Sequence, residues 1–537
     1  MPENKGQNYL HGAAILAAGV IIMKILGAIY KIPLRNILGD AGYGYFNAAY
    51  TIYNVLLTIS TAGLPVALSR IISEENTLGN ANQARRTFRT AFATLLVLGA
   101  ALSAVMFIFP AQMAVILVNK EESSQSIFAL AFSVFLACLC SAFRGYIQGH
   151  SDMKPTTVSQ VLEVLVKVMV GLALARWLTG RGQSLPVSSA GAIFGVTAGS
   201  FAALVYLLAK YRKYGGSKAG APGADIPRSR SSTFGYFLKL GIPITLGASV
   251  TSVVSLLDTK LVNMQLINAG LSGELSDVLY GSYSAMMTLF NFPASFITPL
   301  AISLVPAVSA AVAARRRDEA GEIAESSVRI GSVVAMPMAV GLCVLAYPIV
   351  HVLYGDTHEI GSTLLVLLGA ASFFVCLTLI TSSVLQANGN ERLPMISMLA
   401  GGAVKLGVNW VLVGNPDINI VGAPVGTICC YAVICVLNCI FLKKRLTGEL
   451  SFTKAFVRPL FSSLVMGAVA RAIYGLASGF AGGPAADRVM MAICMTAAII
   501  IAVAAYIALV ILTRAVTLDD MKLIPKGEKL AKILKIR

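Results

Sequence analysis

The chain has 537 residues, of which 56% are hydrophobic and only 12% are charged. An average soluble domain carries about 25% charged residues, so the composition excludes both a water-soluble enzyme and a disordered chain. The formal net charge is +17, because 42 lysine and arginine residues outnumber 25 acidic residues. These numbers indicate an integral membrane protein with a basic excess.

The apolar stretches are long and continuous, which predicts an all-α polytopic membrane protein rather than a β-barrel. About fourteen transmembrane helices are expected, some of them longer than a bilayer requires. In chain order, the predicted spans are 9–32, 43–72, 88–118, 126–149, 155–178, 188–210, 234–262, 278–308, 323–350, 360–386, 393–413, 420–442, 455–478 and 488–513. Prolines within spans predict kinks or breaks. These prolines are Pro65, Pro243, Pro293, Pro299 and Pro306.

The sequence repeats itself at an offset near 237 residues. Tyr43-Gly44 matches Tyr280-Gly281, and Lys167 matches Lys405. Each copy holds six spans, an even number, so both copies enter the membrane from the same side as a parallel repeat. This organisation predicts a two-lobed transporter. The predicted domains are an N-terminal bundle (1–210), a basic linker (211–233), a C-terminal bundle (234–445), two extra helices (446–513) and a basic amphipathic tail (514–537).

The basic residues alternate between the two sides of the membrane. If the N-terminus is cytoplasmic, the inside segments hold 27 lysines and arginines and the outside segments hold 7. The positive-inside rule therefore places both termini in the cytoplasm. These charges follow the loop edges without interleaved aromatic residues, so topology and anionic membrane lipids explain them, and nucleic-acid binding is not expected.

Eight basic residues remain within spans or at their ends: Lys24, Arg70, Arg144, Lys167, Lys239, Arg329, Lys405 and Arg471. A charge at mid-bilayer costs about 2.5–3.5 kcal/mol, so it usually faces a cavity or a partner. Arg70, Arg144, Lys239 and Arg329 lie near cytoplasmic ends, where their side chains are expected to snorkel. The candidate substrate-binding residues are Lys24, Lys167 and Lys405, with Arg35, Arg70 and Lys260 as further candidates.

Acidic partners within the spans are few. Glu163 precedes Lys167 by four residues, a helical ion-pair spacing, so it either neutralises Lys167 or balances charge between transport states. Asp258 is a second charge-balancing candidate, for Lys24 or Lys260. A cavity with more basic than acidic residues suits an anionic substrate such as a phosphate or pyrophosphate. An exporter of cationic drugs would show more carboxylates.

Other kinds of chemistry have weak support. The cysteines at 429, 430, 435 and 439 have no nearby histidine and are interpreted as small apolar residues, so no metal is expected. The chain lacks a Walker A loop, a Rossmann fingerprint and a nucleophile elbow. Neither a cofactor nor catalytic residues are therefore expected. A membrane-embedded glycan polymerase would need an acid/base pair in a large outer loop, and the outer loops here are short.

Several motifs in the first quarter of the chain carry a family resemblance. They are Lys24-Ile-Leu-Gly27, Tyr30-Lys31-Ile-Pro33-Leu-Arg35-x-x-Leu-Gly39, Gly42-Tyr43-Gly44-Tyr45, Ala49-Tyr50-x-x-Tyr53 and Gly63-Leu-Pro65-Val-Ala67-Leu-Ser69-Arg70. The sequence resembles the stage V sporulation protein B and polysaccharide-biosynthesis transporters of Gram-positive bacteria. That group belongs to the multidrug/oligosaccharidyl-lipid/polysaccharide exporter superfamily, which includes the lipid II flippases.

The resemblance implies two six-helix bundles around a cavity, and spans 13 and 14 forming a groove for a polyprenyl tail. It implies a functional role for Lys24, which matches a basic residue before Leu-Gly in the flippases. One turn later the chain has Tyr30-Lys31 where Gram-negative flippases carry Arg-Asp.

The expected function is a flippase in the cell membrane of a Gram-positive bacterium. It would move an undecaprenyl-pyrophosphate-linked saccharide, first of all peptidoglycan lipid II, outward by alternating access. A coupling ion or the membrane potential would drive it, and cell-wall synthesis proteins are expected partners. The alternatives are a flippase for capsule, teichoic-acid or spore-cortex precursors, and a cation-coupled drug exporter of the same fold.

Overall fold

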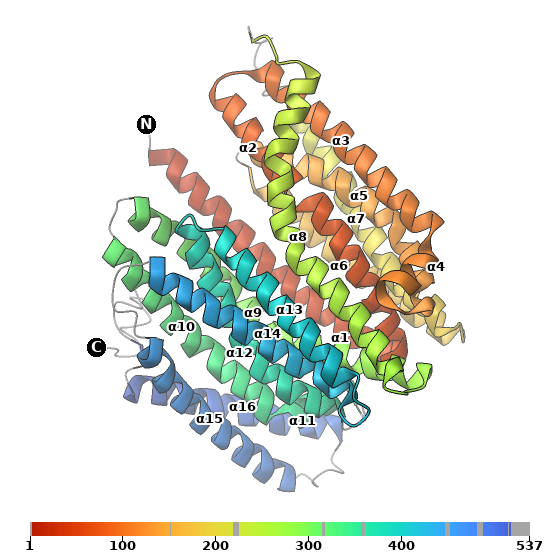
Figure 1. Ribbon diagram of the computed structural model, residues 1–537, viewed down its shortest axis with the longest axis vertical. Coiled ribbons are helices and arrows are strands. Elements are labelled where there is room, and N and C mark those ends of the chain that lie inside the picture. The colour runs from red at the N-terminus through yellow and green to blue at the C-terminus, as the bar shows by residue number, and fades with distance from the viewer. Residues whose placement is uncertain are drawn as a thin grey trace. The chain divides into compact units, whose positions relative to one another are not determined.

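The computed structural model describes residues 3–150, 152–217, 225–313, 317–355, 360–445, 452–480, 487–513 and 515–516. Every regular element in these ranges is a helix, which confirms the all-α class (Figure 1). The predicted tail beyond residue 516 lies outside the described residues. The chain forms two compact units, Met1–Ile267 with Ser272–Gly281, and Asn268–Leu271 with Ser282–Arg537. The domain boundaries expected from the repeat remain predictions.

The first unit holds α1 to α8 and the start of α9. Their bounds are α1 Glu3–Thr61, α2 Leu64–Thr77, α3 Ala81–Ile108, α4 Pro110–Met113, η1 Ala114–Val118, η2 Glu121–Ser123, α5 Ser124–Gly149, α6 Lys154–Gly180, α7 Leu185–Ser217, α8 Arg230–Asn268 and α9 Gly273–Ala313. Helix α7 packs against both α5 and α6, and α3 packs against α5 (Figure 1).

The second unit holds the rest of α9 and the helices that follow. Their bounds are α10 Arg317–Val344, α11 Ala346–Tyr354, α12 Ile360–Ala387, α13 Arg392–Val413, η3 Asn419–Val421, α14 Gly422–Arg445, α15 Phe452–Phe480 and α16 Arg488–Leu512. Helix α10 packs against α12 and α15, and α16 packs against α15. The Tyr506 hydroxyl of α16 donates a hydrogen bond to the Val333 carbonyl of α10 at 2.7 Å. The two helices beyond the repeat are therefore joined to the second unit through α10.

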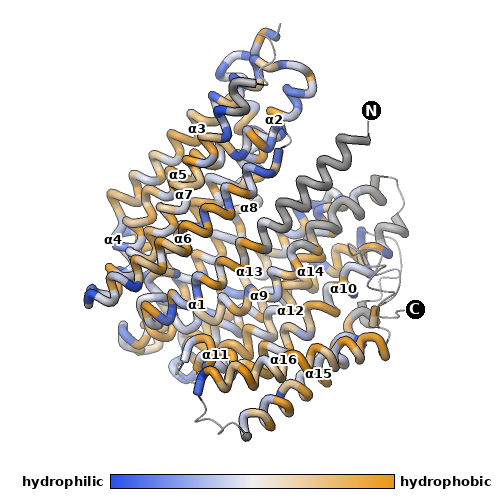
Figure 2. Tube along the Cα trace, turned by 180° about the vertical axis from the view of Figure 1, so that it is seen from behind, coloured by the Kyte–Doolittle hydropathy of each residue, from blue (hydrophilic) through white to orange (hydrophobic). Residues whose placement is uncertain are grey.

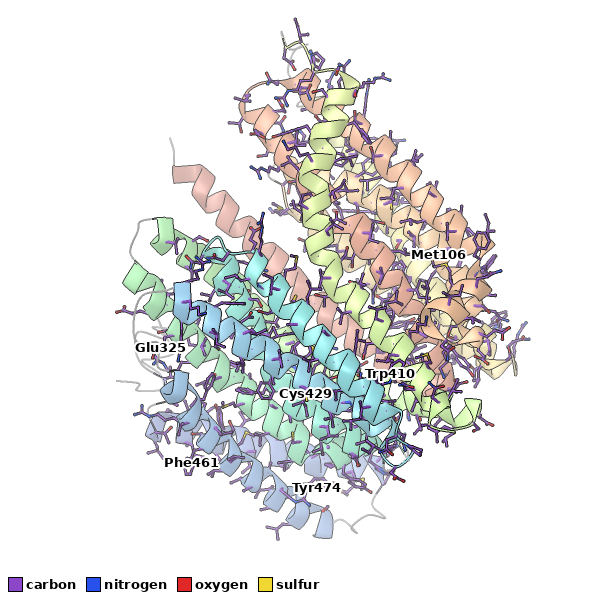
Figure 3. All side chains as sticks on the ribbon, in the orientation of Figure 1. Met106, Glu325, Trp410, Cys429, Phe461 and Tyr474 are labelled. Carbon is purple, nitrogen blue, oxygen red and sulfur yellow. The ribbon has the colours of Figure 1, made fainter. Side chains whose placement is uncertain are left out.

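Twelve described helical stretches are long and apolar enough to cross a membrane (Figure 2). One of them, Ile25–Thr77, is 53 residues long and contains parts of two predicted spans. Another predicted span, 278–308, lies on α9, whose side chains are described only in part. Large apolar side chains face outward, as Trp410 and Phe461 do with 57% of each exposed (Figure 3). Such exposure suits a protein whose solvent is lipid.

Bends and breaks divide the long apolar stretches. Helix α1 bends at Gly39, whose backbone has φ 70° and ψ 179°, a conformation open to glycine at little cost. A break follows Thr61, and Pro65 lies in the first turn of α2, as its position in the predicted span suggested. The predicted span 88–118 is also interrupted, because α3 ends at Ile108 and Pro110 begins a new turn. A proline fits a first helical turn, where its missing N–H is not needed.

The two copies of the Tyr-Gly repeat motif meet inside the first unit. A Cβ atom on Gly44 would lie 3.4 Å from the Gly281 Cα atom and 3.3 Å from the Asp277 carbonyl oxygen. A Cβ atom on Gly281 would overlap the carbonyl oxygen of Asp40. The start of α9 can therefore approach α1 this closely because Gly281 lacks a side chain, and the space beside Gly44 is also tight.

We predict that Gly281→Ala lowers the free energy of unfolding by about 1–3 kcal/mol, because the added methyl group forces the two backbones apart. The matched control is Gly273→Ala in the same helix, where an added Cβ meets nothing within 4 Å. Thermal unfolding of the purified protein in detergent measures both variants. Equal midpoints for the two variants would show that the close approach does not limit stability.

Candidate functional site

Helix α6 places Lys167 beside two tyrosine rings of α1. The Lys167 ammonium lies 4.6 Å from the centroid of the Tyr50 ring and 5.3 Å from that of Tyr30, and it donates to the Tyr50 hydroxyl at 3.1 Å. A cation near an aromatic face is attracted by the ring quadrupole. Buried Tyr30 is itself fixed by a 2.9 Å hydrogen bond to the Ala192 carbonyl. The sequence predicted Lys167 as a deep cation but not its tyrosine partners.

An aromatic column orients these rings. Tyr43, Phe46, Tyr50 and Tyr53 recur every three or four residues, so they share one face of α1 beyond its bend. Successive ring centroids lie 6.0, 5.8 and 5.6 Å apart. The Lys31 ammonium also lies 5.9 Å from the Tyr50 centroid. Two lysines therefore converge on one tyrosine, which makes the local potential positive.

Arg35 and Asp40 form an ion pair across the bend of α1. The guanidinium donates from Nε at 2.8 Å and from Nη2 at 2.7 Å to the two carboxylate oxygens of Asp40. Only 6% of Arg35 is exposed. A two-pronged arginine–carboxylate pair is strong and directional. Arg35, a predicted substrate-binding residue, is thus already engaged by a carboxylate that fixes the bend.

Glu163 pairs with Arg144 of α5 rather than with Lys167. Arg144 Nη2 donates to Glu163 Oε2 at 2.8 Å, and the Ser200 hydroxyl donates to Glu163 Oε1 at 2.8 Å. Arg144 Nε also donates to the Ser159 hydroxyl at 3.0 Å. The expectation that Arg144 snorkels was wrong, because a carboxylate on the neighbouring helix satisfies it within the protein. Among the described residues, Lys167 forms no ion pair with a carboxylate.

Lys120 and Asp277 form a second buried ion pair that sequence analysis missed. Lys120 was counted as an outer-loop charge, yet only 4% of its side chain is exposed. Asp277 also accepts a 2.6 Å hydrogen bond from the Tyr45 hydroxyl. Two residues before Lys120, the Val118 carbonyl accepts a 2.8 Å hydrogen bond from the side-chain amide of Asn263. One sequence signal could have marked Asp277 as a residue of interest: it lies three residues before the repeated Tyr280-Gly281.

The other candidates lie in different surroundings. Arg70 is exposed on α2, Lys260 is partly exposed and Asp258 is buried on α8, all within the first unit. Lys405 is buried on α13 of the second unit. It lies thirteen residues after the start of its helix, as Lys167 does in α6, which agrees with their equivalence in the repeat. The side chain of Lys24 lies outside the described residues.

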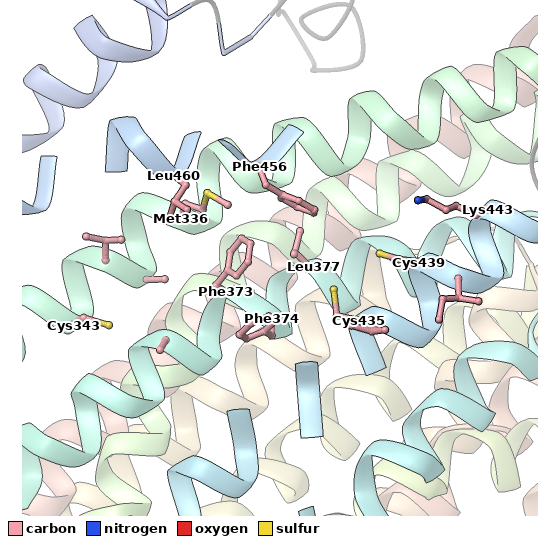
Figure 4. Close-up of a pocket in the computed structure, with 15 residues that line it drawn as sticks. Met336, Cys343, Phe373, Phe374, Leu377, Cys435, Cys439, Lys443, Phe456 and Leu460 are labelled. Carbon is pink, nitrogen blue, oxygen red and sulfur yellow. The ribbon is translucent and has the colours of Figure 1, made fainter. Parts of the chain in front are cut away.

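The second unit contains an apolar pocket of about 630 Å³ between α10, α12, α14 and α15 (Figure 4). Aliphatic, aromatic and sulfur-containing side chains line it, and Lys443 is its one charged lining residue. Cys435 and Cys439, from the cluster considered for metal binding, also line it. Among the described residues, no three histidine, cysteine or acidic side chains gather in a way that would hold a metal ion. The pocket suits a hydrocarbon chain.

Residues 9–312, more than half of the chain, match the family model described as polysaccharide biosynthesis protein. The chain belongs to this family. A second model, MatE, matches residues 260–411. The family assignment confirms the resemblance seen in the N-terminal motifs, and the twelve candidate spans make this member a multi-pass membrane protein.

Related proteins occur in Bacillus subtilis strain 168. The lipid II flippase MurJ is 24% identical over 75% of this chain and 77% of its own length. Stage V sporulation protein B is 24% identical, covering 97% of this chain and 98% of its own. The uncharacterized membrane protein YabM is 27% identical over 98% of this chain and 96% of its own length.

Two solved structures have the same fold. The inward closed conformation of the lipid II flippase MurJ aligns with a TM-score of 0.67 at 14% identity, covering 93% of this chain and 99% of that one. An inward-facing multidrug resistance MATE family transporter of the MOP superfamily aligns at 0.66 and 14% identity, covering 83% and 99%. This member of the polysaccharide biosynthesis family therefore has the fold of MOP-superfamily transporters.

We predict that Arg144→Met destabilises the protein by about 3 kcal/mol, because it leaves the Glu163 carboxylate in a low-dielectric interior without its cation. The double variant Arg144→Met/Glu163→Gln should recover most of this loss. Thermal unfolding in detergent measures the variants. The control is Arg329→Met, since Arg329 pairs with Glu325 at 3.6 Å within a single helix, where a pair contributes only about 0.5 kcal/mol. Failure of the double variant to recover stability would argue against this pairing.

Proposed function

We propose that the protein moves an undecaprenyl-pyrophosphate-linked saccharide from the inner to the outer leaflet, and that peptidoglycan lipid II is the substrate to test first. The family and the fold support a transporter or flippase of the MOP superfamily. The named flippase and sporulation relatives in a Gram-positive bacterium support a role in cell-wall or spore-envelope synthesis. The proposed location is the cell membrane, with both termini cytoplasmic.

The observation that carries this proposal is the environment of Lys167. Its ammonium interacts with Tyr30 and Tyr50, whereas Arg35 and Arg144 are each held by a carboxylate. Cation–π contacts contribute about 0.5–2 kcal/mol, less than a charge-assisted bond to an oxyanion. The tyrosines can therefore position the lysine without neutralising it. We propose that Lys167 binds the pyrophosphate. Lys24 and Lys405, the repeat equivalent of Lys167, are proposed as further substrate-binding residues.

The lipid part of the substrate needs an apolar surface. The pocket between α10, α12, α14 and α15 has one cation and otherwise mostly apolar walls. Helix α15 belongs to the pair that lies beyond the repeat, so these two helices would serve the lipid tail rather than the saccharide. We propose that the polyprenyl chain occupies this pocket during transport.

Transport in this scheme requires alternating access and no covalent step. Asp258 would balance the substrate-binding cations when the pyrophosphate leaves, whereas Glu163, the other candidate for this role, is held by Arg144 and Ser200. The membrane potential contributes about 2.3 kcal/mol per charge moved per 100 mV, so it or a coupling ion would drive the cycle. The MatE match over residues 260–411 favours a cation-coupled multidrug exporter as the second candidate. Flippases for capsule, teichoic-acid or spore-cortex precursors are the closest alternatives in substrate.

We predict that this protein restores the outward exposure of lipid II in Bacillus subtilis depleted of its native flippases. Lys167→Met should reduce the exposure rate about tenfold or more, since it removes a charge-assisted contact to the pyrophosphate. The control is Lys239→Met, an exposed lysine of α8. Lipid II accessible from outside intact cells is the readout. Absence of rescue by the well-expressed wild-type protein would overturn the lipid II assignment, and full activity of Lys167→Met would overturn the site.

We also predict that Ala370→Trp, which adds bulk to the apolar pocket from an exposed position on α12, slows lipid II exposure without lowering the melting temperature. An indole group in the pocket would exclude part of the polyprenyl chain. Ala104→Trp, at an exposed position on α3, is the matched control. The same cell assay compares the two variants. An unchanged exposure rate for Ala370→Trp would exclude this pocket as the tail site.

A further inference from the structure

The first unit also contains a pocket, and four arginines line it. It has a volume of about 810 Å³ and lies between the beginning of α3 and the beginning of α8. Arg85, Arg86 and Arg89 come from α3, and Arg230 comes from α8. The proposed transport mechanism uses none of these residues. Hydrophilic residues gather at this end of α3 and α8 (Figure 2).

The wall of this arginine pocket is fixed by the segment before α8. The Asp225 carboxylate accepts hydrogen bonds from the backbone N–H groups of Asn82 at 3.2 Å and Gln83 at 2.9 Å, in the first turn of α3. The Gln83 side-chain oxygen in turn accepts from the backbone N–H of Arg228 at 2.8 Å. The two bonds to Asp225 satisfy donors that every helix leaves unpaired at its N-terminus, and the third joins Gln83 to the segment before α8. The pocket is thus built by both polypeptide segments.

The charges in the pocket are largely uncompensated. Arg86 donates to the carbonyl oxygens of Pro227 and Arg228, at 3.3 and 2.7 Å, which leaves its positive charge intact. The acids of the surrounding segments have other partners, because Asp225 accepts from the α3 backbone and Glu75 pairs with Arg228. Arg85, Arg89 and Arg230 are exposed and form no ion pair with any described residue. The arginine pocket is therefore a concentrated cationic site that suits an oxyanion.

The surroundings favour a lipid over a soluble anion. From the arginines the pocket lining continues along α3 through Thr90 and Ala93 to Thr94, and it includes Phe234 of α8, which is 42% exposed. Farther along α3, Val97 is 64% exposed, on a helix long and apolar enough to cross the membrane. Ile226, in the segment that builds the wall, is 96% exposed, which is unfavourable in water and favourable in a membrane interface. A ligand with an anionic head group and an apolar body fits a cationic pocket that is followed by apolar surface along α3.

We propose that the arginine pocket binds the phosphate group of an anionic membrane lipid. The planar arginine side chains would bind phosphate oxygens in pairs, and the acyl chains would run along α3 toward Val97. The positive-inside pattern assigns this end of α3 to the cytoplasmic leaflet. Binding would hold α3, α8 and the end of the linker between the two sequence repeats together at the membrane surface.

Thermal unfolding of the full chain in a neutral detergent tests this proposal. The probes are phosphatidylglycerol, phosphatidylcholine with the same acyl chains, and inorganic phosphate. The pocket variant is Arg85→Gln/Arg89→Gln/Arg230→Gln. The matched control, Lys154→Gln/Arg212→Gln/Arg392→Gln, removes the same charge from exposed residues that the topology places on the same side.

Phosphatidylglycerol should raise the melting temperature of the wild-type protein and of the control variant, whereas phosphatidylcholine should not. The pocket variant should need about tenfold more phosphatidylglycerol for the same shift, because three arginine contacts are lost. Replacement of the same three residues by lysine keeps the charge and should give a smaller loss. This lysine variant also preserves the test if the glutamine variant does not fold.

Three results would overturn the proposal. An equal loss of response in the control variant would show diffuse surface attraction. An equal stabilisation by inorganic phosphate would show a site for soluble anions. An unchanged response of the pocket variant would show that the lipid binds elsewhere.

Discussion

The low dielectric of a membrane protein interior imposes the constraint on which the first unit depends, because each buried charge there needs a partner. Two ion pairs meet this need by joining different helical segments. Arg144 pairs with Glu163 of the next helix, and Lys120 pairs with Asp277, which is distant in the chain. A third, Arg35 with Asp40, fixes the bend of one helix. Lys167 is stabilised differently, by aromatic rings. This contrast separates cations that maintain the structure from one that remains able to bind a charged ligand.

The fold was predictable because the hydrocarbon of a membrane permits few backbone arrangements, so long apolar stretches predict helices. The interruption near Phe109 was less clear, since hydropathy continues across it while Pro110 changes the hydrogen bonding. In the candidate site, Lys167 could be identified from the sequence because it lies deep within a predicted span. Its partners depend on helix rotation, which sequence spacing does not reveal. The spacing of Glu163 and Lys167 suggested a local pair, but a serine and an arginine from neighbouring elements bind Glu163 instead.

The classification of basic residues by topology was useful but incomplete. Counting by segment assigned Lys120 to an outer loop, although the structure buries it against Asp277. The same counting treated Arg85, Arg86 and Arg89 as determinants of orientation, and the structure gathers them with Arg230 around one pocket. A residue selected for topology can also acquire a binding role, because membrane insertion depends on where the charge lies in the chain and binding depends on its neighbours in space.

The contact between Gly44 and Gly281 has a consequence for the history of the duplicated sequence. After a duplication, the two copies are ordinarily free to drift apart, since each packs against different neighbours. Here equivalent positions of the two copies lie against each other. A Cβ atom on Gly281 would overlap the Asp40 carbonyl oxygen of α1, whereas one on Gly44 would lie 3.3 Å from the Asp277 carbonyl oxygen of α9. Divergence at this crossing is therefore restricted most at Gly281, where any side chain would meet the backbone of the segment that carries the first Tyr-Gly pair.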